Sequence, residues 1–457
     1  MMLDYFSLED YDVVGLDMDH TLCRYHLKET SELVYNSYAK FLVEEKGYSE
    51  ELLTSYDHEF SMRGLILECL QGNLLKLDKE GRILRASHGT RAMSRADIIE
   101  QYGPEMRWKH FESFSKSLVS PPQCHFFDNF VEQSGALLCA RIVDLMDKAG
   151  ASDTKTYTFW KDVIAAVEQN YNPRSFKADR GGYFPALKRT PGKYLRAPTP
   201  VLTNWLSKLR SAGKVTVLLT SSHSDYCRLV ASHTLGVDFE NLFDVIISYA
   251  LKPGFFSEKP IRRPFLTLEQ DVEGPALSEL PGPGWYSQGN WTQLHSLLQR
   301  LTGKASPKMV YVGDSIRCDI LAASQRANLD TVLVLEELVD TVSGKQGLDC
   351  KVQKKLDLEG NSSGVSIQRE PPCKRTKWKN IPLTNTDNGF WGPMFYDGGI
   401  ADVNDSSPKE TFFHAVMEQH ASLVLPSVEV LASVPLNYKF PCTSACRDST
   451  AKSCSNE

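Results

Sequence analysis

Two aspartates, Asp17 and Asp19, stand one residue apart just after an apolar run that contains Val13, Val14 and Leu16. Such a run is typical of a buried parallel strand, and open α/β sheets bind ligands in the crevice beyond the carboxyl ends of their strands. The chain curls where a strand ends, so both carboxylates can face that crevice. Two like charges held close together are unfavourable unless a cation lies between them. Because Mg²⁺ prefers oxygen ligands and a substrate phosphate, the spacing predicts a magnesium site for phosphoryl chemistry.

Three further apolar stretches also end in polar residues, each where a strand is expected to stop. A hydroxyl at the carboxyl end of a strand can donate to a phosphoryl oxygen, and the backbone amides just beyond it can form an anion-binding nest. A Gly-Asp pair after another strand would bring one more carboxylate to the same edge of the sheet. The residues concerned are Thr220 and Ser221 after residues 215–219, Lys252 after residues 243–249, and Asp314 and Asp319 after residues 309–313.

The order of these motifs resembles the haloacid dehalogenase (HAD) superfamily and, within it, the cytosolic purine 5′-nucleotidase family. The closer likeness is carried by Arg63-Gly-Leu, Gly72-Asn-Leu-Leu-Lys-Leu-Asp and His88-Gly, in this order, and it covers residues 11 to about 338. The resemblance implies an α/β fold with a HAD-like Rossmannoid core, in which helices flank a parallel sheet. It also implies a mainly helical cap inserted between the first and second motifs, which would exclude water from the reacting group.

The resemblance also implies a reaction that passes through an aspartyl phosphate. Asp17 would be the nucleophile, and Asp19 would first protonate the leaving group and then activate water. The ammonium of Lys252 would offset the repulsion between the nucleophilic carboxylate and the phosphate dianion. The phosphate-binding residues implied in this way are Thr220, Ser221 and Lys252.

The same resemblance implies how Mg²⁺ would be held. The expected ligands are carboxylate oxygens of Asp17 and Asp314 and the backbone carbonyl of Asp19, while Asp319 would support them. One departure from the family pattern concerns the second motif, because the nucleotidase relatives usually carry asparagine where this chain has Ser221. Phosphate binding remains expected there.

This chain departs from the family pattern at the residues that would select the nucleobase of the substrate. Relatives that hydrolyse purine monophosphates place an arginine and an aspartate on a cap helix, where this chain has Ile164 and Glu168. The loss of a guanidinium removes a bidentate donor to the substrate. The resemblance therefore implies a nucleotide substrate without implying a preference for purines.

The periodicity of apolar residues divides the chain into expected regions. Helices are predicted over 33–45, ending at Gly47, over much of 111–169, and over 200–212, 291–301 and 411–419. A β-hairpin is predicted around residues 75–84, with Lys76 as a solvated cation on it. Residues 171–200 look like a connector or the end of the cap, and residues 264–290 are rich in proline and glycine. The expected regions are 1–45 and 196–342 for the two parts of the core, 46–195 for the hairpin and cap, 343–389 for a disordered or loop-like insertion, and 390–457 for a C-terminal docking segment with a frayed tail.

Composition narrows the class of protein. The 457 residues carry a formal net charge of −6, which argues against a nucleic-acid surface, and no apolar run is long enough to span a membrane. The N-terminus lacks the layout of a signal peptide, and the 11 cysteines are odd in number and scattered, so reduced thiols and a cytoplasmic location are expected. A homo-oligomer is also expected, because relatives are multimeric.

Together these observations predict a Mg²⁺-dependent phosphomonoester hydrolase of the 5′-nucleotidase type, with a nucleoside 5′-monophosphate as the expected substrate. Two alternatives stay open. The altered cap helix and the long C-terminal extension suggest a binding or scaffold protein with little turnover, although a binder needs no nucleophile. A phosphatase for a non-nucleotide phosphomonoester would carry the same motifs.

Overall fold

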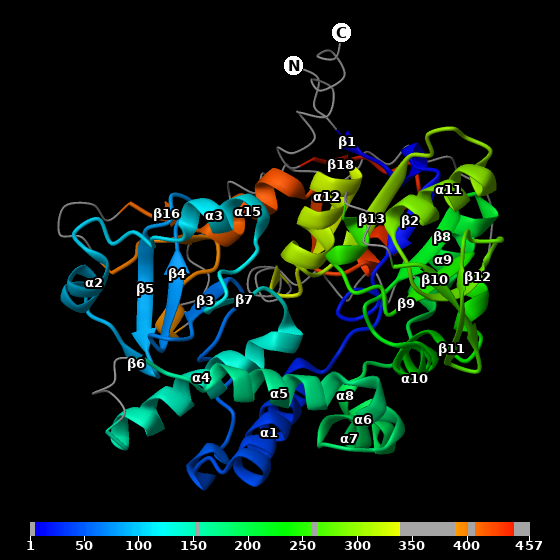
Figure 1. Ribbon diagram of the computed structural model, residues 1–457. Coiled ribbons are helices and arrows are strands. Elements are labelled where there is room, and N and C mark those ends of the chain that lie inside the picture. The colour runs from blue at the N-terminus through cyan, green and yellow to red at the C-terminus, as the bar shows by residue number, and fades with distance from the viewer. Residues whose placement is uncertain (1–4, 151–155, 258–262, 339–388, 401–406, 443–457) are drawn as a thin grey trace, which may run out of the picture.

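The computed structural model describes residues 5–150, 156–257, 263–338, 389–400 and 407–442. Two sheets dominate the molecule, a nine-stranded sheet and a five-stranded sheet, and they lie on opposite sides of the view in Figure 1. The predicted loop-like insertion 343–389 lies outside the described residues apart from Gly389, and so does the tail 443–457. No helix within the described ranges is long and apolar enough to cross a bilayer.

The nine-stranded sheet has a mainly parallel arrangement. Its seven strands from β12 to β17 run parallel to one another, and β10 runs antiparallel to both of its neighbours. The strands are, in sheet order, β11 (Val272–Leu277), β10 (Phe265–Glu269), β12 (Gly284–Gln288), β9 (Val245–Ser248), β8 (Val215–Leu219), β2 (Val13–Leu16), β13 (Met309–Gly313), β14 (Asp330–Val334) and β17 (Leu423–Leu425).

The buried strands of this sheet explain why their sequences are apolar almost without interruption. Successive side chains point to opposite faces, and helices cover both faces. Val13 packs into the core that contains residues of α11 (Trp291–Thr302), whereas Val14 packs into the core that contains residues of α9 (Pro200–Ser211) and α10 (Ser224–Leu235). A parallel sheet with helices on both faces is the architecture expected from the sequence.

The chain between β2 and β8 forms the second sheet and most of the helices. The sheet is antiparallel, and the predicted hairpin is confirmed, because β4 and β5 pair around the turn that contains Gly81. The expectation of a mainly helical insertion was too simple, since three more strands join this hairpin. The strands are, in sheet order, β6 (Arg91–Ala92), β5 (Ile83–His88), β4 (Asn73–Leu77), β3 (Leu65–Glu68) and β7 (Cys124–Phe127).

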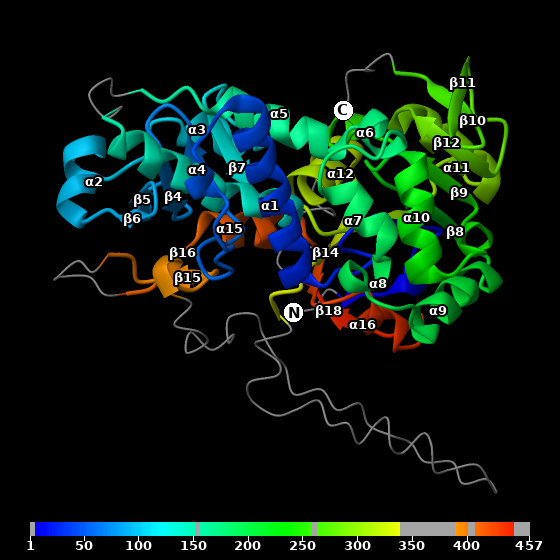
Figure 2. The same ribbon diagram turned by 90° about the horizontal axis from the view of Figure 1, so that it is seen from below.

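Helices of this insertion connect the two sheets. α1 packs against α4 and α5, and in Figure 2 it lies between the part that carries the antiparallel sheet and the part that carries the nine-stranded sheet. α1 ends at Gly47, whose φ of 74° is left-handed, as the sequence predicted. The helices of the insertion are α1 (Leu27–Lys46), α2 (Arg95–Tyr102), α3 (Phe111–Ser117), α4 (Phe130–Lys148), α5 (Trp160–Tyr171), α6 (Pro173–Lys177), α7 (Tyr183–Arg189) and α8 (Pro191–Tyr194).

Two stretches that are rich in proline and glycine have regular structure, and the first of them was expected to be a connector or the end of the cap. Residues 171–200 contain the short helices α6 to α8, and residues 264–290 contain β10, β11 and β12. The strand β12 extends the parallel sheet beside β9, and β10 and β11 form a hairpin on its edge. Proline and glycine were poor guides to irregular structure here, because proline is compatible with the first turn of a helix, as in α6 and α8, and with an edge strand such as β11.

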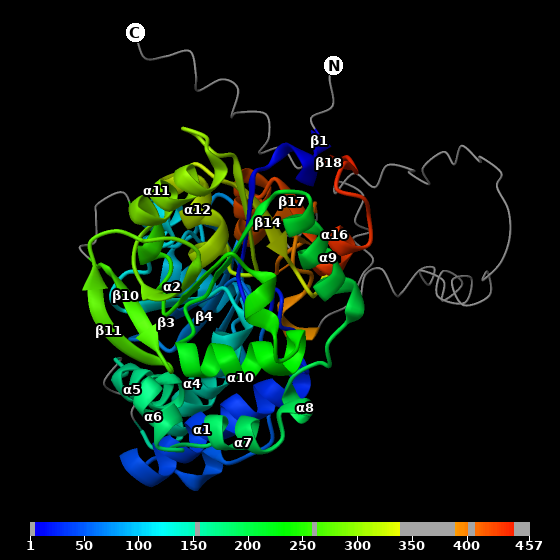
Figure 3. The same ribbon diagram turned by 90° about the vertical axis from the view of Figure 1, so that its right-hand side faces the viewer.

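The C-terminal residues return to both sheets. β17 pairs with β14 at the edge of the nine-stranded sheet, and α16 (Glu429–Ala432) lies beside α9, as Figure 3 shows. The helix predicted over 411–419 is confirmed as α15 (Phe412–His420), which begins where the hydroxyl of Thr411 accepts from the backbone of His414. The remaining described elements are β1 (Tyr5–Phe6), β15 (Tyr396–Asp397), β16 (Lys409–Glu410), β18 (Phe440–Pro441) and α12 (Ala322–Ala327).

Lys76 is the clearest correction to the sequence reading of the insertion. It was expected to be a solvated cation on the hairpin, but its side chain is buried. Its ammonium donates to the backbone oxygens of Trp391 and Pro393 and to a carboxylate oxygen of Asp397, at 2.6–2.7 Å. Arg85 also pairs with Asp397. The expected docking segment thus packs on the antiparallel sheet through a buried ion pair.

Candidate active site

The carboxyl ends of four parallel strands bring the predicted site residues together. Asp17 follows β2, Thr220 follows β8, and Asp314 follows β13, while Lys252 lies four residues beyond β9. These side chains line one cavity of about 340 Å³, a size within the usual range for small-molecule sites. The other site residues expected from the sequence line the same cavity: Asp19, Ser221 and Asp319.

The ammonium of Lys252 lies at the centre of the site. It is 2.7 Å from Oδ1 of Asp17 and 2.6 Å from Oδ1 of Asp319, and it also donates to the hydroxyl of Tyr311 at 3.1 Å. Burial opposes the charge on this lysine, but the carboxylates of Asp17 and Asp319 prevail and raise its pKa well above the usual value. The ammonium is therefore permanently charged beside the expected nucleophile.

Glycines make room for this arrangement at two places. A β-carbon on Gly15 would lie 2.9 Å from the ring of Tyr311, and one on Gly313 would lie 2.4 Å from Cγ of Asp319. Such distances are shorter than real carbon contacts, so any side chain at either position would displace a partner of Lys252. In the Gly313-Asp314 pair, the glycine is therefore needed for steric reasons and the aspartate for chemical ones.

Three carboxylates form a group that could hold a cation. One carboxylate oxygen each from Asp17, Asp314 and Asp319 lies within 4.8 Å of the others. Oδ2 of Asp314 is buried and has no hydrogen-bond partner among the described residues. Three acids face the ammonium of Lys252, and the guanidinium of Arg63 lies 3.9 Å from Oδ2 of Asp314 but also pairs with Glu337. Negative charge is therefore still in excess, and the oxygen donors suit a hard divalent ion such as Mg²⁺. The residues present therefore fit the ion that the sequence predicts.

The electrostatics of the acids follow from their burial. Desolvation raises the pKa of Asp17 to about 7, although Lys252 opposes that rise, and Asp319 adds to it. Burial and the neighbouring carboxylates of Asp319 and Asp17 raise the pKa of Asp314 well above its ordinary value. A bound cation would restore the ionised forms, because opposite charge favours a carboxylate over its acid.

The side chain of Asp19 has partners of its own and stands apart from the three acids. Its Oδ1 accepts from the hydroxyl of Tyr25 at 2.5 Å, and its Oδ2 accepts from the hydroxyl of Ser222 at 2.7 Å. The sequence assigned its metal contact to the backbone carbonyl, which leaves the carboxylate free for proton transfer. Neither Tyr25 nor Ser222 was singled out from the sequence.

The two hydroxyl residues of the second motif take different positions. The hydroxyl of Thr220 accepts from the backbone of Ser222 at 3.1 Å and borders the cavity. The hydroxyl of Ser221 accepts from the backbone nitrogen of Lys252 at 3.0 Å, so it ties the loop after β8 to the loop after β9. The serine that replaces the family asparagine thus holds the backbone of the lysine.

Arg63 is a site residue whose role the sequence did not reveal. Its guanidinium is fully buried and donates to the backbone oxygen of Asp314 at 3.0 Å. It also forms a bidentate pair with Glu337 and lies over the ring of Phe130. The Arg63-Gly-Leu motif therefore connects the insertion to the loop that carries Asp314, a long-range contact that no local pattern could indicate.

Aromatic residues of the insertion complete the wall of the cavity. They are Phe130, Tyr171, Tyr183 and Phe184. Ile164 and Glu168 do not line the cavity, because both are exposed on the outer side of α5. The substitution of the family arginine and aspartate at these two positions therefore stays a sequence-based prediction about the preferred base.

Comparisons with known proteins agree with the motifs. The family model described as the 5′ nucleotidase family matches residues 4–362. The human 5′-nucleotidase domain-containing protein 1 is 45% identical over 98% of this chain and 96% of its own length, and the bovine protein is 44% identical over the same shares. The human 5′-nucleotidase domain-containing protein 2 is 26% identical over 73% of this chain and 62% of its own length. A HAD phosphatase from Thermococcus onnurineus, 20% identical, covers 37% of this chain and 62% of its own, with a TM-score of 0.21.

The family model and the two type 1 domain-containing relatives confirm the resemblance to the 5′-nucleotidase family that the motifs indicated. The family model spans most of the chain and the similarity to the type 1 proteins spans nearly all of it. The chain belongs to the 5′ nucleotidase family, and it is a phosphomonoester hydrolase of the 5′-nucleotidase type.

Proposed function

We propose that this protein is a Mg²⁺-dependent phosphatase of the HAD type that hydrolyses nucleoside 5′-monophosphates through an aspartyl phosphate. The observation that carries the proposal is the placement of Lys252 between Asp17 and Asp319, beside a buried oxygen of Asp314 that accepts no hydrogen bond from the described residues. A nucleophile, a fixed cation and spare anionic ligands in one cavity are what phosphoryl transfer requires.

In the first step a carboxylate oxygen of Asp17 attacks the phosphorus, and the bond from phosphorus to the ester oxygen breaks. Asp19 gives its proton to the leaving alkoxide. Lys252 stabilises the negative charge on the transferring group, and the hydroxyl of Thr220 donates to a phosphoryl oxygen.

In the second step Asp19, now ionised, takes a proton from a water molecule that attacks the phosphorus. The bond between phosphorus and the Asp17 oxygen breaks, inorganic phosphate leaves, and both aspartates return to their starting forms. Asp17, Asp314 and the backbone carbonyl of Asp19 would hold Mg²⁺, with Asp319 beside them. When bound, the ion supplies positive charge that offsets the repulsion between the acids and the phosphate.

The test is phosphate release from a panel of nucleoside 5′-monophosphates and non-nucleotide phosphomonoesters, with and without Mg²⁺. We expect Mg²⁺-dependent release from at least one nucleotide and none from Asp17→Asn. Beryllium fluoride with Mg²⁺ mimics an aspartyl phosphate, so it should raise the melting temperature of the wild type and leave Asp17→Asn unchanged.

Release only from sugar or protein phosphates would keep the mechanism but reject the nucleotide. Equal silence of wild type and Asp17→Asn, with no beryllium fluoride effect, would reject catalysis and favour the scaffold alternative.

A further inference from the structure

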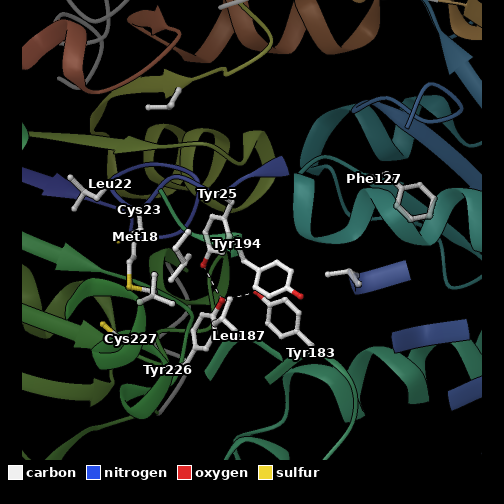
Figure 4. Close-up of a cluster of buried hydrophobic side chains, with 14 of the residues drawn as sticks. Met18, Leu22, Cys23, Tyr25, Phe127, Tyr183, Leu187, Tyr194, Tyr226 and Cys227 are labelled. Carbon is white, nitrogen blue, oxygen red and sulfur yellow. Dashed lines mark hydrogen bonds between the residues drawn. The ribbon is translucent and has the colours of Figure 1, made fainter. Parts of the chain in front are cut away.

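A row of three buried tyrosine hydroxyls leads to Asp19. The hydroxyl of Tyr25 donates to Asp19 at 2.5 Å and lies 2.9 Å from the hydroxyl of Tyr226, which lies 2.7 Å from the hydroxyl of Tyr183. Figure 4 shows the last two contacts as dashed lines within the cluster of apolar side chains. We name Tyr25, Tyr226 and Tyr183 the tyrosine row.

The members of the tyrosine row come from distant parts of the chain. Tyr25 lies between β2 and α1, Tyr226 lies in the first turn of α10, and Tyr183 begins α7 in the insertion. The ring of Tyr183 also packs against Phe184, and both side chains border the cavity. The row therefore connects the wall of the cavity to the carboxylate expected to move protons.

The direction of the hydrogen bonds follows from the ends of the row. In the second step Asp19 is ionised and can only accept, so Tyr25 uses its single proton on Asp19, and its contact with Tyr226 requires Tyr226 to donate. Tyr226 has then spent its own proton, so Tyr183 must donate to it. All three hydroxyls point toward Asp19, and donors in series strengthen one another in a dry interior.

Burial keeps the row neutral. Desolvation raises the pKa of each of the three phenols well above its ordinary value, and the charge of Asp19 adds to that rise. The row therefore supplies no proton to the reaction. It offers oriented dipoles, and Ser222 holds the other oxygen of the carboxylate.

We propose that Tyr25 is a positioning residue that fixes the Asp19 carboxylate for proton transfer, and that Tyr226 and Tyr183 hold Tyr25 in place from α10 and α7. This inference rests on the proposed function, because it gives Asp19 the role of acid and base. If the hydroxyls only satisfied one another's hydrogen bonds in the core, loss of the Tyr25 hydroxyl should lower kcat/KM in parallel for all substrates.

The two steps of the reaction depend on Asp19 differently for different leaving groups. A nucleoside alkoxide needs a proton from Asp19 in the first step, whereas p-nitrophenolate leaves without one. The second step, attack by water, needs Asp19 as base for every substrate. Loss of the Tyr25 hydroxyl should therefore slow both steps for a nucleotide and only the second step for p-nitrophenyl phosphate.

The experiment uses the full chain with Mg²⁺ and compares Tyr25→Phe with wild type on both substrates. For p-nitrophenyl phosphate, kcat should fall about tenfold with kcat/KM nearly unchanged, and the initial burst of p-nitrophenolate should remain. For a nucleoside 5′-monophosphate that the wild type hydrolyses, kcat and kcat/KM should both fall about tenfold.

Two further variants keep the test decisive if Tyr25→Phe folds poorly. Tyr226→Phe breaks the next link and should produce the same pattern with a smaller effect, about threefold. The matched control is Tyr194→Phe, which removes the hydroxyl of a buried tyrosine in the same cluster that makes no hydrogen bond to the tyrosine row, and it should behave like wild type.

Three results would overturn the inference. Wild-type behaviour of Tyr25→Phe would show that the hydroxyl does not position Asp19. A parallel loss of kcat/KM for both substrates would indicate a structural role alone. A wild type that hydrolyses neither substrate and binds no beryllium fluoride would remove the proposed function itself, an outcome distinct from the first two.

Discussion

Two lysines are buried in this molecule to the same extent and serve different ends. The side chain of Lys252 is 3% exposed and that of Lys76 is 4% exposed. Lys252 faces Asp17 and Asp319, with Asp314 close by. Lys76 faces one carboxylate, that of Asp397, which it shares with Arg85.

The balance of charge separates the two environments. Around Lys252 the carboxylates outnumber the cations, and their field raises the pKa of the lysine well above its usual value. Around Lys76 the cations outnumber the acids, and burial lowers its pKa to about 8. An excess of buried negative charge is tolerated only if another cation arrives, so the first environment has the character of a site and the second that of a fixed contact.

Asp17→Asn should have the largest effect of any change on the Lys252 side of this comparison. The amide is nearly isosteric but cannot attack phosphorus, so kcat should fall at least about a thousandfold. Stability should not fall, because one of several repelling carboxylates is removed. The measurements are phosphate release and a thermal melt, and a variant that retains turnover would exclude Asp17 as nucleophile.

Lys252→Met should have the second-largest effect on turnover. The variant loses the ammonium that stabilises the transferring group, so kcat should fall by about 10²–10³-fold. It also leaves Asp17 and Asp319 without their cation, and Mg²⁺ should therefore stabilise the variant more than it stabilises the wild type. If Mg²⁺ stabilises both proteins equally, the ion does not bind close enough to Lys252 to interact with the same carboxylates.

Lys76→Met tests the other lysine and should change stability without changing turnover per folded molecule. Two buried backbone oxygens lose their donor while Asp397 keeps Arg85, so the free energy of unfolding should fall by about 2–3 kcal/mol. Denaturant melts and kcat of the folded fraction measure the two effects. A loss of kcat without a loss of stability would place Lys76 in the catalytic machinery, and the proposed difference between Lys76 and Lys252 would not hold.

Mg²⁺ binding should give the smallest effect. At ten times its Kd the ion should add about 1.4 kcal/mol to the free energy of unfolding of wild type, because only the folded chain assembles the three acids. Asp314→Asn should lose most of this stabilisation, whereas Asp12→Asn, which alters an acid paired with Lys304 elsewhere, should keep it. Equal stabilisation of both variants would show that the ion binds at another place.

The sequence alone determined which residues gather at the edge of the sheet. A buried strand shows itself as an apolar run and its end as a change to polar residues, so Asp17, Thr220 and Asp314 were identifiable at strand ends, whereas Lys252 was assigned through the family resemblance. The hairpin around Gly81 and the end of α1 at Gly47 were identifiable for the same reason, since both depend on a few neighbouring residues.

Tertiary structure alone decided the rest, because it depends on residues far apart in the chain. The burial of Lys76 requires a segment more than three hundred residues away. Arg63 gains its partners only when the insertion folds against the core. Tyr25 lies six residues from Asp19, but its contact with Tyr226 joins residues 201 positions apart. The outward direction of Ile164 depends on which side of α5 packs inward. Local pattern fixes which groups are available at a strand end, whereas long-range packing fixes which charges are left without a partner.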